Sequence, residues 1–427
     1  MIARTRSGRF RGIGVVAVLA ALVVAGCSKG TATKDSSGGG ITTVHYLTFS
    51  AAPDHLKDLD AIVKAFEKEN PKIKVAVQTA PYADYFTKLQ TAIAGDTAPD
   101  AFELDYQNFV TYAEGGSLAD LAGPMSSNPS WAVNKLAPSA MQAFQHGGKQ
   151  YALPESFSTV VLLYNKKLFD AAGLSYPTAD WTWADETAAA RKLTNTKKGV
   201  YGDFQPVSFY EFYKAVNQAG GSFLSADGHK ATFNDAAGVA AAAWLAGKPG
   251  HTMPSLTKIG NTPDFDTNLF KAGKLAMWHN GNWQFDGLKS VPFGWDVVVE
   301  PGDKAKASAV FENAVAVSAA SKHQDAAFRW IGYLTTSQQT VQSRITSSWE
   351  LPPLADAGKL SGYLDITPPD NRRAVMDALG KQSLLPVIAK EQQMQDIVND
   401  ALQKIAGGAD AQKTLDAAAS KVDGLLA

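Results

Sequence analysis

Carboxylates are the side chains in this sequence with the clearest capacity for acid–base chemistry. Glu103 and Asp105 stand two residues apart at the end of a predicted strand, so they point to the same face. Glu155, Glu312 and Glu350 lie in segments that we predict to be loops. A glycosidase needs two carboxyl groups about 5–10 Å apart across a sugar. With 41 acidic residues such pairs arise by chance, so we favour hydrogen-bond acceptors over catalysts.

Other catalytic and metal-binding motifs are absent from the sequence. No two of the seven histidines lie within one helical turn of each other, and no H-E-x-x-H occurs. The one cysteine, Cys27, cannot form a thiolate cluster for zinc. Neither a G-x-S-x-G nucleophile turn nor a G-x-x-x-x-G-K-[ST] phosphate loop is present. We therefore expect no catalytic residue, no metal and no cofactor.

Tryptophans near glycine, asparagine or proline form a second set of candidates. Four of them lie in predicted strand ends and loops: Trp278, Trp283, Trp295 and Trp349. A flat indole ring can pack on the C–H face of a pyranose, while a neighbour such as Asn280 binds hydroxyl groups. Core packing explains any one of them equally well, but we expect at least one ligand contact in the set. Helical positions predict core packing for Trp183, Trp244 and Trp330.

The elements that must position these residues follow a repeating pattern. Residues 41–49 are β-branched and aromatic and predict a strand. Apolar residues at helical spacing over 56–66 predict a helix, and 73–77 alternate as a strand does. A helix over 82–93 and a strand over 99–104 follow. Strands alternating with helices predict βαβ units and a mainly parallel sheet flanked by helices.

The pattern continues through the rest of the chain. Further strands are predicted over 160–164, 274–279, 297–299 and 314–318, and the last third is helix-rich. About 400 residues remain after the N-terminal segment, enough for two domains. Breaks near Leu153-Pro154 and over 307–311 are candidate crossings between two lobes. Because ligands bind beyond the carboxyl ends of strands in such sheets, a cleft between the lobes is expected.

The N-terminus reads as a secretory signal with a lipid-attachment cysteine. Four arginines precede an apolar run over 13–24, and Val24-Ala25-Gly26-Cys27 resembles a bacterial lipobox. We expect residues 1–26 to be removed and 27–40, rich in Gly and Ser, to be a flexible tether. A membrane anchor with an incidental cysteine is the disfavoured alternative, because the run is short for a bilayer. The protein would then be lipid-anchored on the outer face of the cell membrane.

The charge balance excludes a general affinity for nucleic acid. Removal of residues 1–26 takes away four of the 40 basic residues and none of the 41 acidic ones, which leaves a net charge of −5. Nucleic-acid binding needs a basic face.

Several short segments together resemble a known family. They are 66–75 (FEKENPKIKV), 98–101 (APDA), 112–118 (YAEGGSL), 151–154 (YALP), 163–169 (LYNKKLF), 270–277 (FKAGKLAM) and 281–283 (GNW). From Ile41 onward the chain resembles the extracellular solute-binding proteins of bacterial ABC importers, in the carbohydrate-binding family that includes maltose-binding protein. The resemblance implies a two-lobed type II periplasmic-binding-protein fold. The N-terminal lobe would be 41–153 plus 310–350 and the C-terminal lobe 154–309 plus 351–427.

The resemblance also implies where a ligand would bind. Matching positions are Ser50, Asp54, Asp105, Tyr106, Glu155, Ser156, Tyr210 and Trp283. Loop context, rather than the resemblance, adds Asn280, Glu312 and Trp349.

As a function, the resemblance implies capture of a mono- or oligosaccharide by hinge closure and delivery to a membrane permease. The implied partners are the sugar and the transmembrane subunits of the importer, and we expect a monomer. A surface carbohydrate-active enzyme and a sensory binding protein remain alternatives. A phosphorylated polyol is disfavoured because we find no basic cluster in the cleft loops. The choice of sugar does not follow from the resemblance.

Overall fold

The computed structural model describes residues 40–50, 53–260, 262–347, 349–383, 385–388 and 390–426. Contacts divide the chain into Met1–Gly40 and Ile41–Ala427. The predicted signal peptide, Cys27 and all of the tether before Gly40 lie outside the described residues. The folded unit begins at Ile41.

The strands of this unit form one large sheet and one small one. The large sheet has the order β2-β1-β3-β9-β6-β7, with β8 added to β6 and β10 to β9. Its strands are β1 (Thr42–Thr48), β2 (Ile73–Thr79), β3 (Ala101–Asp105), β6 (Ala152–Asn165), β7 (Met277–Gly281), β8 (Trp295–Val298), β9 (Ser308–Val317) and β10 (Gln382–Ser383). The small sheet pairs β4 (Gln145–His146) with β5 (Lys149–Gln150).

The large sheet is mixed, which corrects the expectation of a mainly parallel sheet in each lobe. β1 pairs in parallel with β2 and β3, as the predicted βαβ units require. β9 is antiparallel to β3 and β6, and β6 is antiparallel to β7 and β8. A βαβ pattern fixes the direction of consecutive strands only, so the direction of a strand that returns from far along the chain is not visible in the sequence.

The two expected crossings lie inside strands. Pro154 is within β6, where a register shift between Pro154 and Ser156 marks a bulge. Proline has no N–H to donate, and bulges are one of the few places where a sheet accepts it. Residues 308–311 belong to β9. Both expected crossings are therefore extended, and the strands that contain them pair with each other in antiparallel register.

Helices cover the sheet. The longer ones are α1 (Pro53–Glu69), α2 (Tyr82–Ala94), α3 (Tyr106–Glu114), α7 (Trp183–Leu193), α8 (Phe209–Gln218), α9 (Ala236–Ala246), α12 (Gln324–Thr336), α13 (Gln338–Ser347), α16 (Glu391–Ala406) and α17 (Ala411–Leu426). The shorter ones are α4 (Ala122–Ser127), α5 (Pro138–Ala143), α6 (Lys166–Ala172), α10 (Leu256–Ile259), α11 (Phe265–Lys271), α14 (Ser361–Leu364) and α15 (Arg373–Leu379). The 3-10 turns are η1 (Pro129–Trp131), η2 (Val133–Lys135), η3 (Thr196–Lys198), η4 (Asn282–Gln284), η5 (Asp286–Leu288) and η6 (Ala357–Leu360).

The first turn of α7 contains a capping box. Thr182 accepts the N–H of Asp185, and the Asp185 carboxylate accepts the Thr182 N–H at 2.8 Å. This capping box satisfies two backbone donors that the first turn leaves free. Among the described residues, no helix has the length and apolar character that crossing a bilayer demands.

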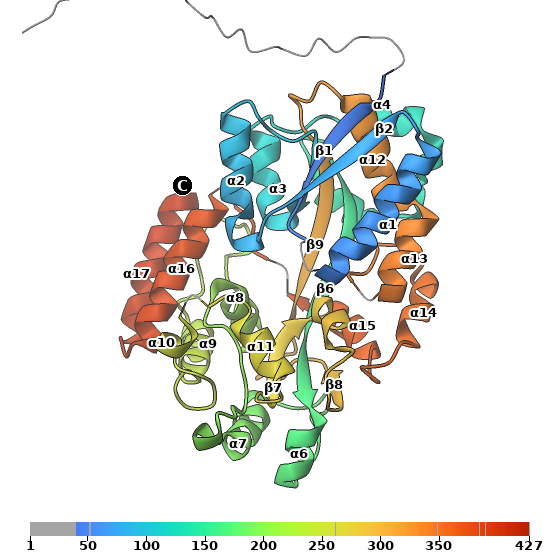
Figure 1. Ribbon diagram of the computed structural model, residues 1–427. Coiled ribbons are helices and arrows are strands. Elements are labelled where there is room, and N and C mark those ends of the chain that lie inside the picture. The colour runs from blue at the N-terminus through green and yellow to red at the C-terminus, as the bar shows by residue number, and fades with distance from the viewer. Residues whose placement is uncertain are drawn as a thin grey trace, which may run out of the picture. The chain divides into compact units, whose positions relative to one another are not determined.

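Buried apolar side chains form two groups of cores along the large sheet. The first core group surrounds β1, β3 and the start of β6, and includes Tyr46, Phe102 and Trp330. The second core group surrounds β7, β8 and the rest of β6, and includes Tyr164, Phe212 and Trp278. In Figure 1, α1, α2, α3 and α12 lie around β1 and β2, whereas α6, α7 and α11 lie around β7 and β8. β6 and β9 contribute residues to both groups.

Candidate ligand-binding site

Side chains from distant parts of the chain meet beside the end of β3. Tyr82, the first residue of α2, donates its hydroxyl hydrogen to Asp105 Oδ2 at 2.7 Å. The same hydroxyl oxygen lies 3.3 Å from the hydroxyl of Tyr210 on α8. The Gln107 amide donates to Tyr82 at 3.0 Å and to Tyr210 at 3.3 Å. We call these four residues the tyrosine bridge, because they connect α2 and α3 to α8.

Local sequence explains why the bridge residues meet. Asp105 ends β3 and caps α3, where its carboxylate accepts the N–H of Asn108 at 2.9 Å. Gln107 is thereby held in the first turn of α3. The start of α8 is tied to α16, because the side-chain oxygen of Asn399 accepts the N–H of Phe209 at 2.7 Å. Tyr210, the next residue, is thus held half-buried in the first turn of the helix.

Trp283 and Phe311 extend the bridge with aromatic surface. The ring centroid of Phe311 lies 5.7 Å from that of Tyr210 and 5.8 Å from that of Trp283, both edge-on. Trp283 is half-buried in η4, directly after β7. The turn is tied to β6 because Asn282 Oδ1 accepts the N–H of Thr159 at 2.8 Å. Half-exposed aromatic rings beside carboxylate and amide groups suit a ligand with both apolar and hydroxyl-bearing faces.

Three buried glutamates and one buried arginine form a second polar group, which we call the carboxylate cluster: Glu103, Glu155, Glu350 and Arg344. Arg344 bonds Glu155, and its Nη1 lies 3.7 Å from Glu350 Oε2. Burial first, and then the charges of Glu155 and Glu350, raise the pKa of Glu103 well above its ordinary value. One guanidinium cannot balance three carboxylates, so the cluster carries an excess of acidic groups in a low dielectric.

Short polar side chains surround the cluster. Ser50 donates to Glu103 at 3.2 Å, and Ser156 donates to Glu350. The amide of Asn313 donates to Glu350 Oε2 at 3.2 Å. Asn313 of β9 is also the register partner of Asp105 on β3. The carboxylate cluster and the tyrosine bridge are therefore adjacent along the same strand ends.

Trp349 packs at the edge of the carboxylate cluster. Its ring is stacked on His55 with centroids 5.0 Å apart, and the Arg344 guanidinium carbon lies 4.2 Å from the ring centroid. Four buried polar atoms here have no hydrogen-bond partner: Glu155 Oε2, Arg344 Nε, Arg344 Nη1 and Trp349 Nε1. Unpartnered buried donors and acceptors cost free energy, so hydroxyl groups that reach them would be bound favourably.

Burial shifts the acidic groups of the site toward their neutral forms. It raises the pKa of Asp105 to about 6, against hydrogen bonds from Tyr82 and Asn108. It raises that of Glu155 to about 7, although the Arg344 charge opposes the shift. Glu391, at the start of α16, has its pKa raised to about 8 by burial. Acids that titrate near neutral pH can donate as well as accept hydrogen bonds.

The structure brings most of the expected site residues into these two groups. Ser50, Glu155, Ser156 and Trp349 lie in or against the carboxylate cluster, and Asp105 and Tyr210 belong to the tyrosine bridge. Trp283 contacts the bridge through Phe311. Their roles in binding stay predictions.

Four expected residues stand apart from these groups or are not described. Tyr106 is half-buried and edge-on to Phe144, with centroids 6.2 Å apart. Glu312 is half-buried on β9, and burial raises its pKa. The amide nitrogen of Asn280 lies 3.4 Å from Asp266 Oδ2 and donates to it. The side chain of Asp54 lies outside the described residues.

Three of the four loop tryptophans are buried in the core, an alternative that their sequence context leaves open for any one of them. Trp349 is 1% exposed and packs in the first core group. Trp278 is fully buried within β7 and donates to Asp266 at 2.9 Å. Trp295 is 2% exposed and donates to the Leu288 carbonyl at 3.2 Å. A strand next to a tight turn also places aromatic residues beside glycine and asparagine, so that neighbourhood did not distinguish surface from core.

Sequence reasoning missed several residues of the site. The sequence predicts only a helix that begins at Tyr82, and it gives no sign of a role for Gln107 or Arg344. Arg344 is 189 residues from its partner Glu155 in the sequence.

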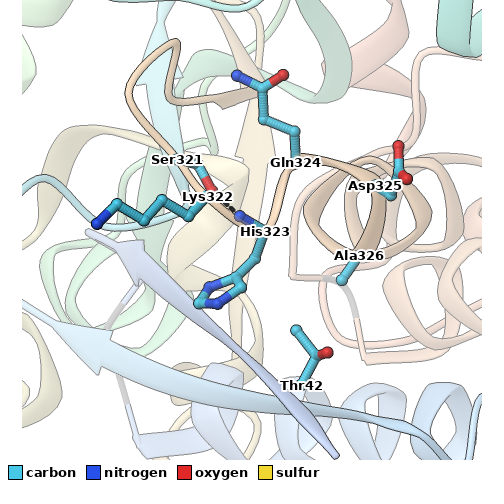
Figure 2. A pocket seen from close by; sticks show the side chains of 7 residues that line it. All are labelled: Thr42, Ser321, Lys322, His323, Gln324, Asp325 and Ala326. Atoms are coloured by element: carbon cyan, nitrogen blue, oxygen red, sulfur yellow. Dashed lines mark hydrogen bonds between the residues drawn. The ribbon is translucent and has the colours of Figure 1, made fainter. Parts of the chain in front are cut away.

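A shallow polar hollow lies at the other end of the same strands. Figure 2 shows it between Thr42, the first residue of β1, and residues 321–326 before and within α12. Seven strand residues, about 20 Å at 3.3 Å per residue, separate Thr42 from the end of β1 near Ser50. The hollow is therefore remote from the tyrosine bridge and the carboxylate cluster.

Comparison with protein families identifies the class of protein. Residues 52–341 match the model of the bacterial extracellular solute-binding protein family. The chain belongs to this family. Proteins of an extracellular family work outside the cytoplasm, as the signal-like N-terminus predicted.

Known relatives of this solute-binding protein support the same class. An ABC substrate-binding protein from Listeria monocytogenes, solved in complex with cycloalternan, is 43% identical, with a TM-score of 0.85 over 90% of this chain and 98% of that chain. The diacetylchitobiose-binding protein of Streptomyces coelicolor is 27% identical over 69% of this chain and 68% of that protein.

A more distant solved structure bears on the fold. A solute-binding protein from Thermotoga lettingae bound to α-D-tagatose has a TM-score of 0.82 at 22% identity, over 91% of this chain and 100% of that chain. The two-lobed type II fold is therefore confirmed.

Proposed function

We propose that this protein is the substrate-binding subunit of an ABC importer and that it captures an oligosaccharide. The observation that carries the proposal is the grouping of Trp283, Phe311 and Tyr210 beside Asp105 and Gln107. Aromatic faces pack on sugar rings, and carboxylate and amide groups bind hydroxyls. The 43% identity to a protein solved with cycloalternan supports a glucose oligosaccharide as the first ligand to test.

Hinge closure is the proposed mode of capture. We propose lobes of 41–153 plus 310–350 and 154–309 plus 351–427. The tyrosine bridge then joins the two, since Tyr82 and Gln107 come from the first and Tyr210 from the second. A sugar that contacts both lobes favours the closed state by its differential affinity for that state.

Calorimetric titration of the purified protein with cycloalternan, maltotriose and diacetylchitobiose tests the proposal. We expect measurable binding of at least one of them. Trp283→Ala should reduce the binding free energy by about 2 kcal/mol or more, the effect of losing a buried aromatic contact. Trp181→Ala is the matched control, because Trp181 is also half-buried but packs near Phe169. Binding of amino acids or metal ions with no response to any sugar would refute the carbohydrate ligand.

The protein is further proposed to bind without turnover. Its relatives are binding proteins by name, and burial keeps Glu103 and Glu155 among other side chains. Incubation with cycloalternan and chromogenic α-glucosides should yield no product. Hydrolysis that disappears in Glu155→Gln would instead establish the enzyme alternative.

Anchoring and delivery complete the proposal. A lipid on Cys27 would hold the monomeric protein at the outer face of the membrane, and the tether would let it reach permease subunits. Co-purification with its permease after mild cross-linking, dependent on the presence of sugar, would support delivery.

A further inference from the structure

Seven titratable side chains form a buried network of ion pairs in the second core group, away from the carboxylate cluster. The cationic members are Lys214, Lys248 and His279, and the acidic members are Glu186, Asp203, Glu211 and Glu300. Each is at most 6% exposed. We call these seven residues the ionic network.

His279 lies at the centre of the network. Its Nδ1 is 2.7 Å from Glu300 Oε1, and its Nε2 is 3.0 Å from Glu186 Oε1. Lys214 is bound by the same Glu300 oxygen at 2.5 Å and by Glu211 at 2.8 Å. A histidine with carboxylates at both nitrogens is held in its doubly protonated form.

Lys248 closes the other side of the network. Its ammonium lies 2.6 Å from Glu186 and 3.0 Å from Asp203. It also donates to the oxygen of Gln205 at 2.7 Å, while the amide of Gln205 donates to Glu211 at 2.7 Å. The contacts form a closed ring in which each charge has an opposite partner.

The network is not a metal site. Glu211, His279 and Glu300 offer ligand atoms within 4.8 Å of one another. Lys214, however, already contacts Glu211 and Glu300, so a divalent cation would have to displace a buried ammonium.

The network joins the two elements that present the aromatic residues of the site. Lys214 and Tyr210 lie four residues apart on α8, one helical turn along the same side. His279 is within β7, and Trp283 follows four residues later in η4. Glu300 bonds both Lys214 of α8 and His279 of β7, so it fixes α8 against β7 and with them the spacing of Tyr210 and Trp283.

We propose that the ionic network positions Tyr210 and Trp283 relative to each other, with His279 as the joint. Buried ion pairs specify an arrangement because any displacement leaves a charge without compensation in a low dielectric. The positioning role stands on its own geometry. Its consequence for sugar binding rests on the proposed function.

The positive charge of His279 is lost at alkaline pH. The groups that face His279 are Glu186 of α7, Glu211 and Lys214 of α8, Glu300 after β8, and Asp203 and Lys248 of the flanking loops. Burial alone would lower the pKa of His279, but Glu186 and Glu300 outweigh it and raise this pKa to about 9. The network is thus complete at pH 7 and loses one positive charge as pH rises through that value.

Fluorine NMR of the protein labelled with 5-fluorotryptophan tests the inference without a ligand. The chain has nine tryptophans, and each contributes one fluorine resonance. The resonance that disappears in Trp283→Phe is that of Trp283. We expect this resonance to titrate between pH 7 and 10 with a midpoint near 9, the pKa of His279. Far-UV circular dichroism at each pH confirms that the protein remains folded.

Two variants sharpen the test. His279→Gln keeps a hydrogen-bonding side chain without a titrating proton, so the transition of Trp283 should vanish. Lys166→Met is the matched control, because Lys166 pairs with Asp296 at 3.2 Å and Asp370 at 2.7 Å at the far end of β6. Its Trp283 titration should equal that of the unmodified protein.

Trp244 provides an internal reference. Its ring lies 3.9 Å from the Lys248 ammonium and edge-on to His279, so it reports titration of the network directly. A Trp244 resonance that moves while Trp283 stays fixed would overturn the positioning role. Failure of both to move would overturn the inference as well.

Ligand binding separates this inference from the proposed function. The Kd for cycloalternan should rise about tenfold between pH 7 and 10, the effect of losing one charge-assisted contact, and should rise less in His279→Gln. If Trp283 titrates as expected but no sugar binds, the proposed function fails and the positioning role stands. An equal rise in both proteins would overturn the link to affinity.

Discussion

The indole ring of Trp283 lies directly against the backbone of Gly281. A Cβ atom at residue 281 would stand 1.8 Å from Cζ3 and 2.1 Å from Cε3 of that ring. Real Cβ atoms do not approach other atoms within 3.0 Å. Glycine is therefore required at this position for the ring to face Phe311.

Gly281→Ala is expected to displace Trp283 and weaken sugar binding without unfolding the protein. The new methyl group must push the ring aside, because the backbone of η4 is held by Asn282. Calorimetry and tryptophan fluorescence should both change. Gly123→Ala is the control, since its Cβ would meet nothing within 4 Å. An unchanged Kd in Gly281→Ala would remove the orientation of Trp283 from the binding mechanism.

Lys214→Met should be strongly destabilising. It leaves Glu211 and Glu300 buried beside an apolar group, and breaking a buried ion pair costs about 3–5 kcal/mol. Urea denaturation measures the free energy of unfolding. Lys404→Met removes an exposed pair with Asp400, and such a pair contributes only about 0.2–1 kcal/mol. Equal losses in both variants would show that the ionic network adds no stability.

Glu391→Gln should stabilise the protein relative to the unmodified chain, and this gain in stability should be larger at pH 8.5 than at pH 5. Burial raises the pKa of Glu391 from its ordinary 4.5 to about 8, so between these values the folded state binds more protons than the unfolded state. Stability from this group therefore falls as pH rises from 4.5 to 8. Glutamine does not titrate, so the variant does not lose stability from this position as the pH rises. Melting temperatures of both proteins at the two pH values give the comparison, and a pH-independent difference would contradict the shift.

Sugars that carry a carboxylate should bind more weakly than their neutral counterparts. The site presents Glu103, Asp105, Glu155 and Glu350 with Arg344 as their buried cation. Like charges within a low dielectric repel, so we expect at least about a tenfold higher Kd for maltobionic acid than for maltitol. Calorimetry at pH 7.5 measures both. Tighter binding of the acid would place Arg344, rather than the glutamates, in contact with the ligand.

Cys27→Ser should release the protein from the membrane. The serine hydroxyl cannot receive the thioether-linked lipid, so the mature chain would lose its proposed anchor. Immunoblots of membrane and medium fractions measure the distribution. A chain that stays with the membrane after this substitution would favour an uncleaved apolar anchor over 13–24.

Local sequence patterns predicted the elements of the first βαβ units well. β1, α1, β2, α2 and β3 lie where apolar periodicity placed them, since their cores form between neighbours in sequence. β6 and β9 are longer than predicted. Polar residues such as Glu155 and Asn313 interrupt the apolar pattern within them, and their burial depends on partners far along the chain.

The candidate site also combines residues that the sequence predicts with residues whose roles depend on distant partners. The family resemblance predicts Asp105 and Tyr210 as site residues, and the structure places Asp105 at the N-cap of α3 and Tyr210 in the first turn of α8. Gln107 and Arg344 gain their roles from partners more than 100 residues away, and nothing in their own neighbourhood signals those partners. Trp278, Trp295 and Trp349 are buried, because surroundings rich in glycine, asparagine or proline are compatible with either a cleft or a core.

The paired course of β6 and β9 restricts how the protein can move. Backbone hydrogen bonds join the two strands from Ala152 to Thr159, so they make a stiff ribbon that can twist or bend but cannot slide. Glu155 and Ser156 lie on that ribbon, at the proposed boundary between the lobes, whereas Tyr210 and Trp283 lie off it. Cargo held at the ribbon would keep its contacts throughout the motion, and the aromatic contacts would be the ones made and broken at each cycle.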